Sequence, residues 1–170
     1  MDTRSVLIDA FGRIAEDVER TIEGLDPAAL AHRPDPDANS IGWLVWHLTR
    51  VQDNHVAEIA GRDQAWITEG WADRFEMAPD PHDVGYGHTS AQVELVRPAN
   101  ADLLEGYHRS VHKRTREYLD TIDADELDRI IDYRWDPPVT VGVRLVSVID
   151  DDMQHAGQAA YVRGLVERLD

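Results

Sequence analysis

An all-α four-helix bundle is the fold class that the sequence predicts, and three observations support it. Four long segments repeat apolar residues at steps of three and four, which is the periodicity of an amphipathic helix. Clusters of proline, glycine and aspartate separate these segments. One connection is long and another is of medium length, as in bundles that use crossovers. The four segments cover residues 3–24, 41–60, 101–122 and 140–169.

The first predicted helix shows this periodicity most clearly. Its other face is rich in Asp, Glu and Arg, so one side is expected to face a core and the other to face water. Gly24 and the pair Asp26-Pro27 end the helix, and the proline-broken stretch 33–37 cannot be helical. The apolar stripe comprises Leu7, Phe11, Ile14, Val18, Ile22 and Leu25.

The connection between the second and third helices is the longest in the chain. Ser40 is the expected N-cap of the second helix. Within residues 64–100, Thr89 and Gln92 form the pattern of a capping box, which predicts a short helix before Pro98. Because a connection of this length is usually functional or folded on itself, we expect it to act as a lid.

Two smaller features stand out in the connections. The aromatic residues Trp66, Trp71 and Phe75 are expected to supply contacts for a homodimer, with packing on their own bundle as the alternative. Residues 130–135 predict a short strand or an extended crossover before the fourth helix, closed by the Asp-Pro-Pro turn at 136–138.

Composition indicates a single acidic domain that spans residues 1–170. The 17 Lys and Arg against 33 Asp and Glu give a net charge of −16, which argues against binding nucleic-acid phosphates or an anionic membrane surface. No apolar run is long enough to span a membrane. With no signal-peptide pattern and no cysteine, we expect a cytoplasmic protein.

The candidate site begins with His47, because bundles build metal sites from inward-facing residues on different helices. This histidine lies in the apolar run WLVWHL, one turn after Trp43 and one turn before Val51. A buried imidazole needs a polar partner. On its position alone, His47 is as compatible with a core histidine that makes one hydrogen bond as with a metal ligand.

Asp151 and His155 form the second part of the candidate site. They are four residues apart on the fourth predicted helix, so they share a face and can converge on one ion. The three consecutive aspartates 150–152 repel one another, and a bound cation would relieve that repulsion. The alternatives are an exposed acidic run with an incidental histidine, or Asp152 as the carboxylate that approaches the ion.

A competing pair of histidines lies on the third predicted helix. His108 is expected to point inward, whereas His112 is adjacent to Lys113 and Arg114, whose charges disfavour a divalent ion. His88 lies in the loop sequence GYGH and could reach the mouth of a site. Phosphate-binding glycine loops, GxSxG elbows and HExxH motifs are absent, so the sequence gives no support for those chemistries.

Two segments of the sequence resemble the ligand helices of the DinB-like superfamily. Residues 40–50 read SIGWLVWHLTR, and residues 151–161 read DDMQHAGQAAY. Their spacing and order hold across almost the whole chain. The resemblance implies an up-down-down-up four-helix bundle with a long crossover between helices 2 and 3. It also implies a divalent metal held by His47, Asp151 and His155.

The carboxylate makes the chain similar to the mycothiol-dependent transferase branch of that superfamily. Many members have a histidine where this chain has Asp151, and that branch has a glutamate, which is one methylene longer. Two histidines and a carboxylate leave coordination positions open, as in reactive metal sites. The resemblance implies Zn²⁺, with Ni²⁺ or Mn²⁺ as alternatives. It also implies a low-molecular-weight thiol as cosubstrate and an electrophile as its target.

Mycothiol-dependent isomerases carry an additional C-terminal domain, whereas this chain ends at Asp170, so we expect thiol S-transfer rather than isomerisation. Family members often form homodimers, and we expect one here. Two other functions stay open. Hydrolysis by a metal-bound water would need no thiol. A non-catalytic binding bundle is favoured by the shorter carboxylate of Asp151.

Overall fold

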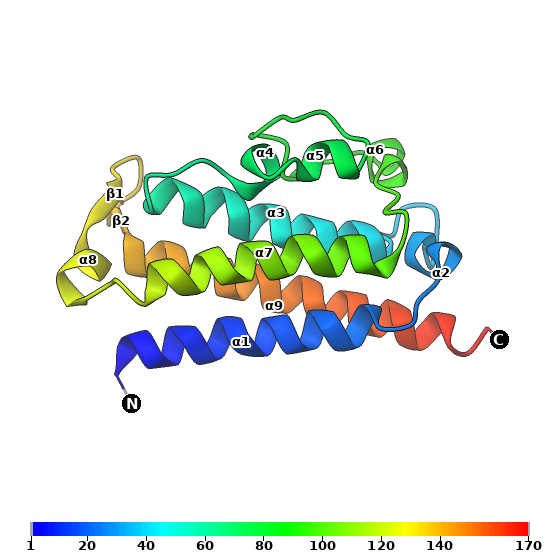
Figure 1. The fold of residues 1–170 in the computed structure, drawn as a ribbon, viewed down its shortest axis with the longest axis horizontal. Helices are drawn as coiled ribbons and strands as arrows, with labels where there is room; N and C mark the ends of the chain where they lie inside the picture. The colour runs from blue at the N-terminus through cyan, green and yellow to red at the C-terminus, as the bar shows by residue number, and fades with distance from the viewer. Residues whose placement is uncertain (1, 170) are drawn as a thin grey trace.

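The computed structural model describes residues 2–169, and four long helices packed side by side dominate it (Figure 1). Helices α1 (Thr3–Ile22) and α9 (Val141–Val166) run in one direction. Helices α3 (Ile41–Ile59) and α7 (Ala101–Leu119) run in the opposite direction. The predicted up-down-down-up bundle with a long crossover between α3 and α7 is therefore confirmed.

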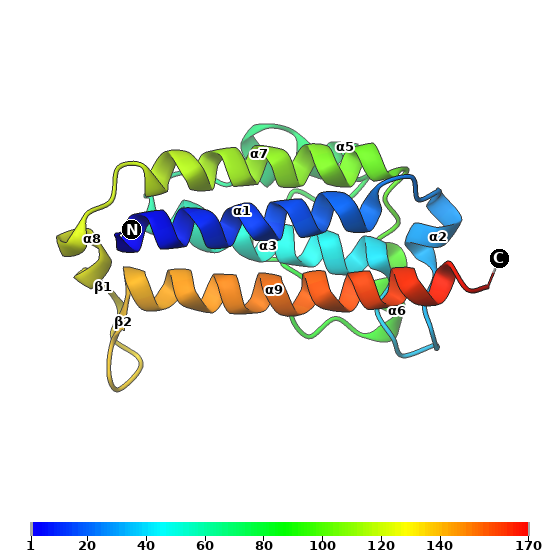
Figure 2. The same cartoon turned by 90° about the horizontal axis from the view of Figure 1, so that it is seen from below.

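Each long helix packs on two neighbours. Helix α1 lies between α7 and α9, and α3 completes the bundle on their other side (Figure 2). The predicted stripe of α1 is buried from Leu7 to Ile22, whereas Leu25 is only partly buried. Burial of these apolar side chains supplies most of the stabilisation of a bundle. The core also contains Leu104, Tyr107, Val111, Leu145, Val148 and Ala159.

Side-chain caps define where the long helices begin. The hydroxyl of Ser40 accepts a hydrogen bond from the amide of Trp43, as predicted for the start of α3. Thr140 accepts from the amide of Val143, so this residue precedes α9 instead of beginning it. Helix α7 ends at Leu119, earlier than the expected residue 122, because the chain turns there towards α8.

Short helices occupy the connections. The capping box at Thr89 and Gln92 is present and begins α6, as predicted. The other short helices were not predicted, because four or five residues are too few to show a helical period. The short helices are α2 (Pro27–Ala31), α4 (Ala65–Thr68), α5 (Trp71–Arg74), α6 (Ser90–Leu95) and α8 (Ala124–Asp128), of which only α6 was predicted.

The aromatic part of the crossover packs on its own bundle. The rings of Trp66, Trp71 and Phe75 surround Tyr107 of α7, with centroid distances of 5.4, 5.5 and 5.8 Å. All three side chains are buried within the chain. The expectation that they supply dimer contacts is wrong, because their apolar surface is already covered, and the alternative of packing on the same bundle is confirmed.

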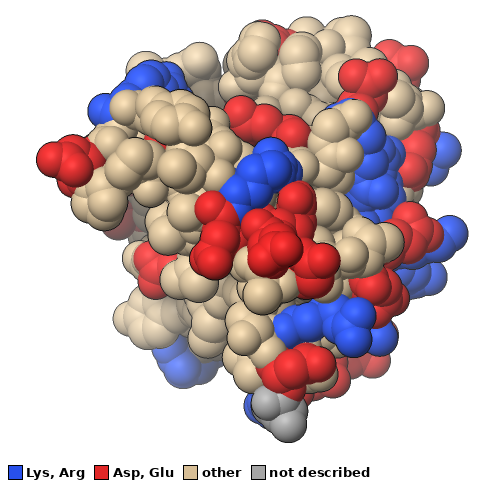
Figure 3. Space-filling view, turned by 90° about the vertical axis from the view of Figure 1, so that its left-hand side faces the viewer, with Lys and Arg blue, Asp and Glu red and all other residues tan. Residues whose placement is uncertain are grey.

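A small hairpin and a mixed-charge surface form one end of the bundle. Strands β1 (Ile130–Asp132) and β2 (Val139–Thr140) pair antiparallel, with Ile130 opposite Thr140. The predicted strand is thus present but shorter than residues 130–135. On this end of the molecule, basic side chains lie among acidic ones (Figure 3). Within residues 2–169, no helix is both long enough and apolar enough to cross a membrane.

Truncation of Phe11 tests the core of the bundle. This side chain is 1% exposed in the middle of α1, so Phe11→Ala leaves a cavity and should lower the free energy of unfolding by about 3–5 kcal/mol. Val6→Ala on the same helix is the control, because Val6 is half exposed, and it should change stability by less than about 0.5 kcal/mol. Equal effects of the two variants in urea denaturation would contradict the packing described.

Candidate metal centre

Three side chains from two helices converge between α3 and α9. His47 comes from α3, and Asp151 and His155 come from α9. One ligand atom of each lies within 4.8 Å of the other two. The three residues selected from the sequence are therefore the ones that the fold brings together. Among residues 2–169, no other group of three or more histidine and acidic residues brings its ligand atoms this close together.

His47 is held by a backbone carbonyl of the crossover. Its Nδ1–H donates a hydrogen bond to the oxygen of Val84, so the lone pair belongs to Nε2. That Nε2 faces Oδ2 of Asp151 at 3.9 Å. Burial lowers the pKa of His47 below its usual value, although the hydrogen bond to Val84 opposes this effect. The imidazole is therefore neutral at pH 7, which is the form that binds a metal.

His155 has an equivalent arrangement. Its Nδ1–H donates to Oε1 of Gln158 over 2.9 Å, and its Nε2 faces Oδ1 of Asp151 at 3.6 Å. The carboxylate of Asp151 thus presents one oxygen to each imidazole. The shorter side chain of aspartate reaches both rings, which lie 4.6 Å apart between centroids.

The residues present fit a divalent ion. Oδ2 of Asp151 is buried and makes no hydrogen bond to any residue in the part of the chain that the structure describes. Two ligand atoms bound to one tetrahedral Zn²⁺ lie about 3.4 Å apart, close to the 3.6 and 3.9 Å separations here. Two imidazole nitrogens and a carboxylate oxygen form a donor set that suits Zn²⁺.

Aromatic rings form one wall of the centre. The indole of Trp43 stacks on His47 with a centroid distance of 4.6 Å and meets His155 edge-on at 6.3 Å. Its Nε1–H donates to Nδ1 of His88, which in turn donates from Nε2 to Asp83. His88, which was expected to reach the mouth of a site, therefore lies next to the centre and holds Trp43 in this wall.

Asp152 does not join the three residues. Its side chain is fully buried, and burial raises its pKa well above the usual value, with the charge of Asp151 as a second cause. A carboxyl group that stays protonated is a poor ligand for a cation. Of the two aspartates considered from the sequence, the structure places Asp151 beside the histidines.

The competing histidine pair lies elsewhere. The rings of His108 and His112 stack on α7 with centroids 6.2 Å apart, and no carboxylate joins them in a cluster among residues 2–169. Burial lowers the pKa of His108 to about 3, with His112 as a second cause. This pair is therefore a core feature without the third ligand that a metal site requires.

An open groove of about 570 Å³ adjoins the centre. It runs between the loop at 34–39, Leu44 of α3 and the outer part of α9. Gln158, which accepts the hydrogen bond from His155, also lines this groove, as do Gln154 and Tyr161. The groove offers apolar surface and neutral amides beside the candidate ligands.

Comparisons with known proteins identify the family and the fold. A family model described as Mycothiol-S-transferase matches residues 6–168. The chain belongs to the mycothiol-S-transferase family. Among solved structures, a conserved protein from Enterococcus faecalis is 34% identical, with a TM-score of 0.90 over 98% of each chain. It has the same DinB-like fold, so the resemblance seen in the sequence is confirmed. No curated protein matches the chain.

Some residues that position the centre of this mycothiol-S-transferase family member could not be recognised from the sequence. Val84 contributes a carbonyl group, which every residue carries, so its identity gives no signal. Gly85 gives a clearer one, because the sequence GYG is typical of a loop that needs positive φ. Gly85 has φ +88°, and it lies directly against the rings of His47 and Trp46.

Gly85→Ala should disrupt the centre. An added Cβ would lie 2.9 Å from Nδ1 of His47 and 2.9 Å from the ring of Trp46. Gly87→Ala is a matched control, because Gly87 also has positive φ but a Cβ there would meet nothing within 4 Å. Both variants should lose about 1–2 kcal/mol of stability from backbone strain. Only Gly85→Ala should weaken Zn²⁺ binding, by tenfold or more in calorimetric titration. Equal affinities would contradict the contact.

His108 should make stability depend on pH. Its pKa is about 3 in the folded chain and about 6.5 when unfolded, so the unfolded state binds more protons between these values. The free energy of unfolding therefore falls as pH decreases below about 7, and His108 contributes at most about 1.4 kcal/mol per pH unit. His108→Gln removes that contribution. Urea denaturation from pH 7.5 to 5 should give a shallower slope for the variant, and parallel slopes would show that His108 is not buried and neutral.

Proposed function

We propose that the chain is a divalent-metal-dependent thiol S-transferase that conjugates a low-molecular-weight thiol of the mycothiol type to an electrophilic substrate. One observation carries the proposal. Two imidazole Nε2 atoms and a carboxylate with an unpartnered oxygen converge in the described chain, on helices that belong to a mycothiol-S-transferase family member. A closed structural site would use four protein ligands, whereas three leave a position for a substrate.

The candidate ligands and the groups that orient them have separate roles. His47, Asp151 and His155 would hold the ion, and we expect Zn²⁺, with Ni²⁺ and Mn²⁺ as alternatives. When bound, the ion supplies Lewis acidity that deprotonates a thiol near neutral pH. The hydrogen bonds from Nδ1 of each histidine to Val84 and Gln158 keep Nε2 directed at Asp151.

The nucleophile must come from outside the chain. The protein has no cysteine, so a thiol cosubstrate supplies the sulfur. The groove beside His155 provides space for the body of that thiol or for the electrophile, and its amide groups at Gln154 and Gln158 can hydrogen-bond a polar ligand. Trp43 shields the two imidazoles on another side from water.

Metal content tests the ligand set. Protein purified without chelator and supplied with zinc, nickel or manganese should contain about one ion per chain by elemental mass spectrometry. His155→Ala should abolish binding and leave the helical circular dichroism unchanged. His108→Ala is the matched control and should keep the ion. Full occupancy in His155→Ala would refute the ligand set, and an empty wild-type protein would favour the non-catalytic bundle.

Thiol dependence tests the reaction. The metal-loaded protein should consume mycothiol together with an activated aryl halide, and chelation should reduce the rate to that of the uncatalysed reaction. Turnover of an ester substrate without any thiol would point instead to hydrolysis by a bound water. Size-exclusion chromatography with light scattering tests the expected homodimer separately.

A further inference from the structure

A fully buried guanidinium connects α3 to the crossover. Arg50 is 0% exposed and lies three residues after His47. Its Nε donates to the carbonyl of Asp83 over 3.1 Å, and its Nη2 donates to the carbonyls of Asp80 and Pro81 over 3.2 Å each. One side chain therefore binds three backbone oxygens within four residues of the crossover.

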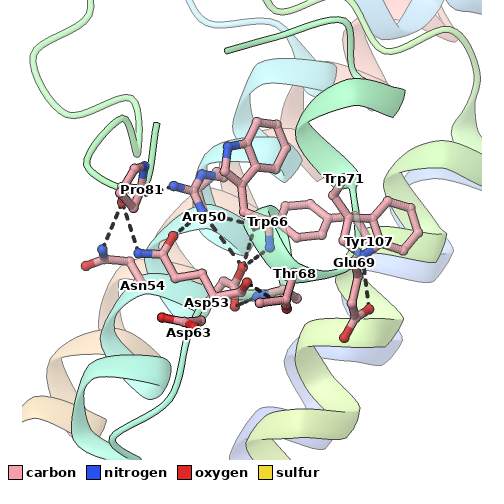
Figure 4. Close-up of polar contacts among 12 residues, drawn as sticks. Arg50, Asp53, Asn54, Asp63, Trp66, Thr68, Glu69, Trp71, Pro81 and Tyr107 are labelled. Atoms are coloured by element: carbon pink, nitrogen blue, oxygen red, sulfur yellow. Dashed lines mark hydrogen bonds and ion pairs between the residues drawn. The ribbon is translucent and has the colours of Figure 1, made fainter. Parts of the chain in front are cut away.

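Side chains from α3, α4, α7 and the crossover surround this guanidinium (Figure 4). Its Nη1 donates to Oε1 of Gln64 over 2.8 Å and to the hydroxyl of Tyr107 over 3.3 Å. The carboxylate of Asp53 lies 3.7 Å away and accepts a hydrogen bond from that hydroxyl. The ring of Trp66 covers the guanidinium at 4.8 Å. Burying a charge without such partners would be strongly unfavourable.

The segment that Arg50 binds leads directly to the candidate metal centre. Asp83, whose carbonyl it holds, precedes Val84, whose carbonyl accepts the Nδ1–H of His47. The side chain of Asp83 also accepts from the amide of Gly85 and from Nε2 of His88. The position of the Val84 oxygen therefore depends on contacts that begin at Arg50.

We propose that Arg50 is a positioning residue for His47. By fixing the backbone at residues 80–83, it places the carbonyl of Val84 so that His47 carries its proton on Nδ1 and presents Nε2 to Asp151. A guanidinium suits this task because Arg50 reaches the three carbonyls from two separate nitrogens, Nε and Nη2, whereas a lysine ammonium directs its three donors from a single nitrogen. The consequence for metal affinity rests on the proposed function, whereas the consequence for the His47 tautomer does not.

The first test uses metal-free protein. Three variants are compared: Arg50→Met, Arg50→Lys and Gln52→Met. Gln52 is an equally buried residue of α3 whose amide donates to Thr115 of α7. Gln52→Met is therefore a matched control, because it also replaces a buried polar side chain of α3 with an apolar one. Nitrogen NMR of labelled histidines at pH 8 should show only the Nδ1–H form of His47 in the wild type and in Gln52→Met. Arg50→Met should show a mixture of tautomers and faster amide exchange at residues 82–86.

The second test measures Zn²⁺ affinity by calorimetry. Arg50→Met should weaken binding by about 10–100-fold, the usual effect of losing a group that orients a ligand. Arg50→Lys should show a smaller loss, and Gln52→Met should stay within about twofold of the wild type. If Arg50→Met does not fold, Arg50→Lys carries both tests.

The outcomes separate the two proposals. A folded Arg50 variant that keeps the wild-type tautomer, amide exchange and Zn²⁺ affinity would overturn the positioning role. A loss of affinity equal to that of Gln52→Met would also overturn it, because the effect would then be one of general stability. A wild-type protein that binds no Zn²⁺ would refute the metal-dependent function, and the tautomer measurement would still decide the role of Arg50.

Discussion

The hydrogen bond between His47 and the carbonyl of Val84 joins the two parts of the molecule on which the candidate centre depends. The bundle supplies the side chains of the three candidate ligands, and the crossover supplies the acceptor from a position 37 residues further along the chain. Because a neutral imidazole can carry its proton on either nitrogen, that acceptor decides which nitrogen faces Asp151. The direction of a lone pair thus depends on how a long connection folds.

The surroundings of Asp151 and Asp152 on α9 also determine how each carboxyl group behaves. Asp151 lies between two imidazoles, and one of its oxygens makes no hydrogen bond within the described chain, whereas its neighbour Asp152 is buried and keeps its proton. Only one of the two adjacent aspartates therefore needs a counter-charge. A single divalent ion would supply it, which resolves the repulsion that the acidic run 150–152 suggests.

The sequence predicted the bundle and the pairing of Asp151 with His155 because both depend on regular spacing, whereas the set of three with His47 was implied by the resemblance to the DinB-like superfamily. Twenty-residue helices repeat their apolar residues several times, and Asp151 and His155 share a face through their spacing of four. The supporting residues could not be predicted in the same way. Val84 acts through its backbone, and the three carbonyls that Arg50 binds lie in a loop whose residues do not repeat at a regular spacing. The aromatic residues Trp66, Trp71 and Phe75 gave the wrong expectation, because hydrophobicity alone does not say which surface they cover.

The long crossover has a consequence for how proteins with this architecture can diverge. Its hydrogen bond to His47 uses a backbone carbonyl, and its attachment to α3 through Arg50 also uses backbone carbonyls. Side chains along residues 80–84 other than that of Asp83, whose carboxylate accepts from Gly85 and His88, can therefore be exchanged without removing either connection. The exposed side chains of the crossover can change through mutation while the geometry of His47, Asp151 and His155 is preserved, so that this surface and the candidate centre are able to evolve independently.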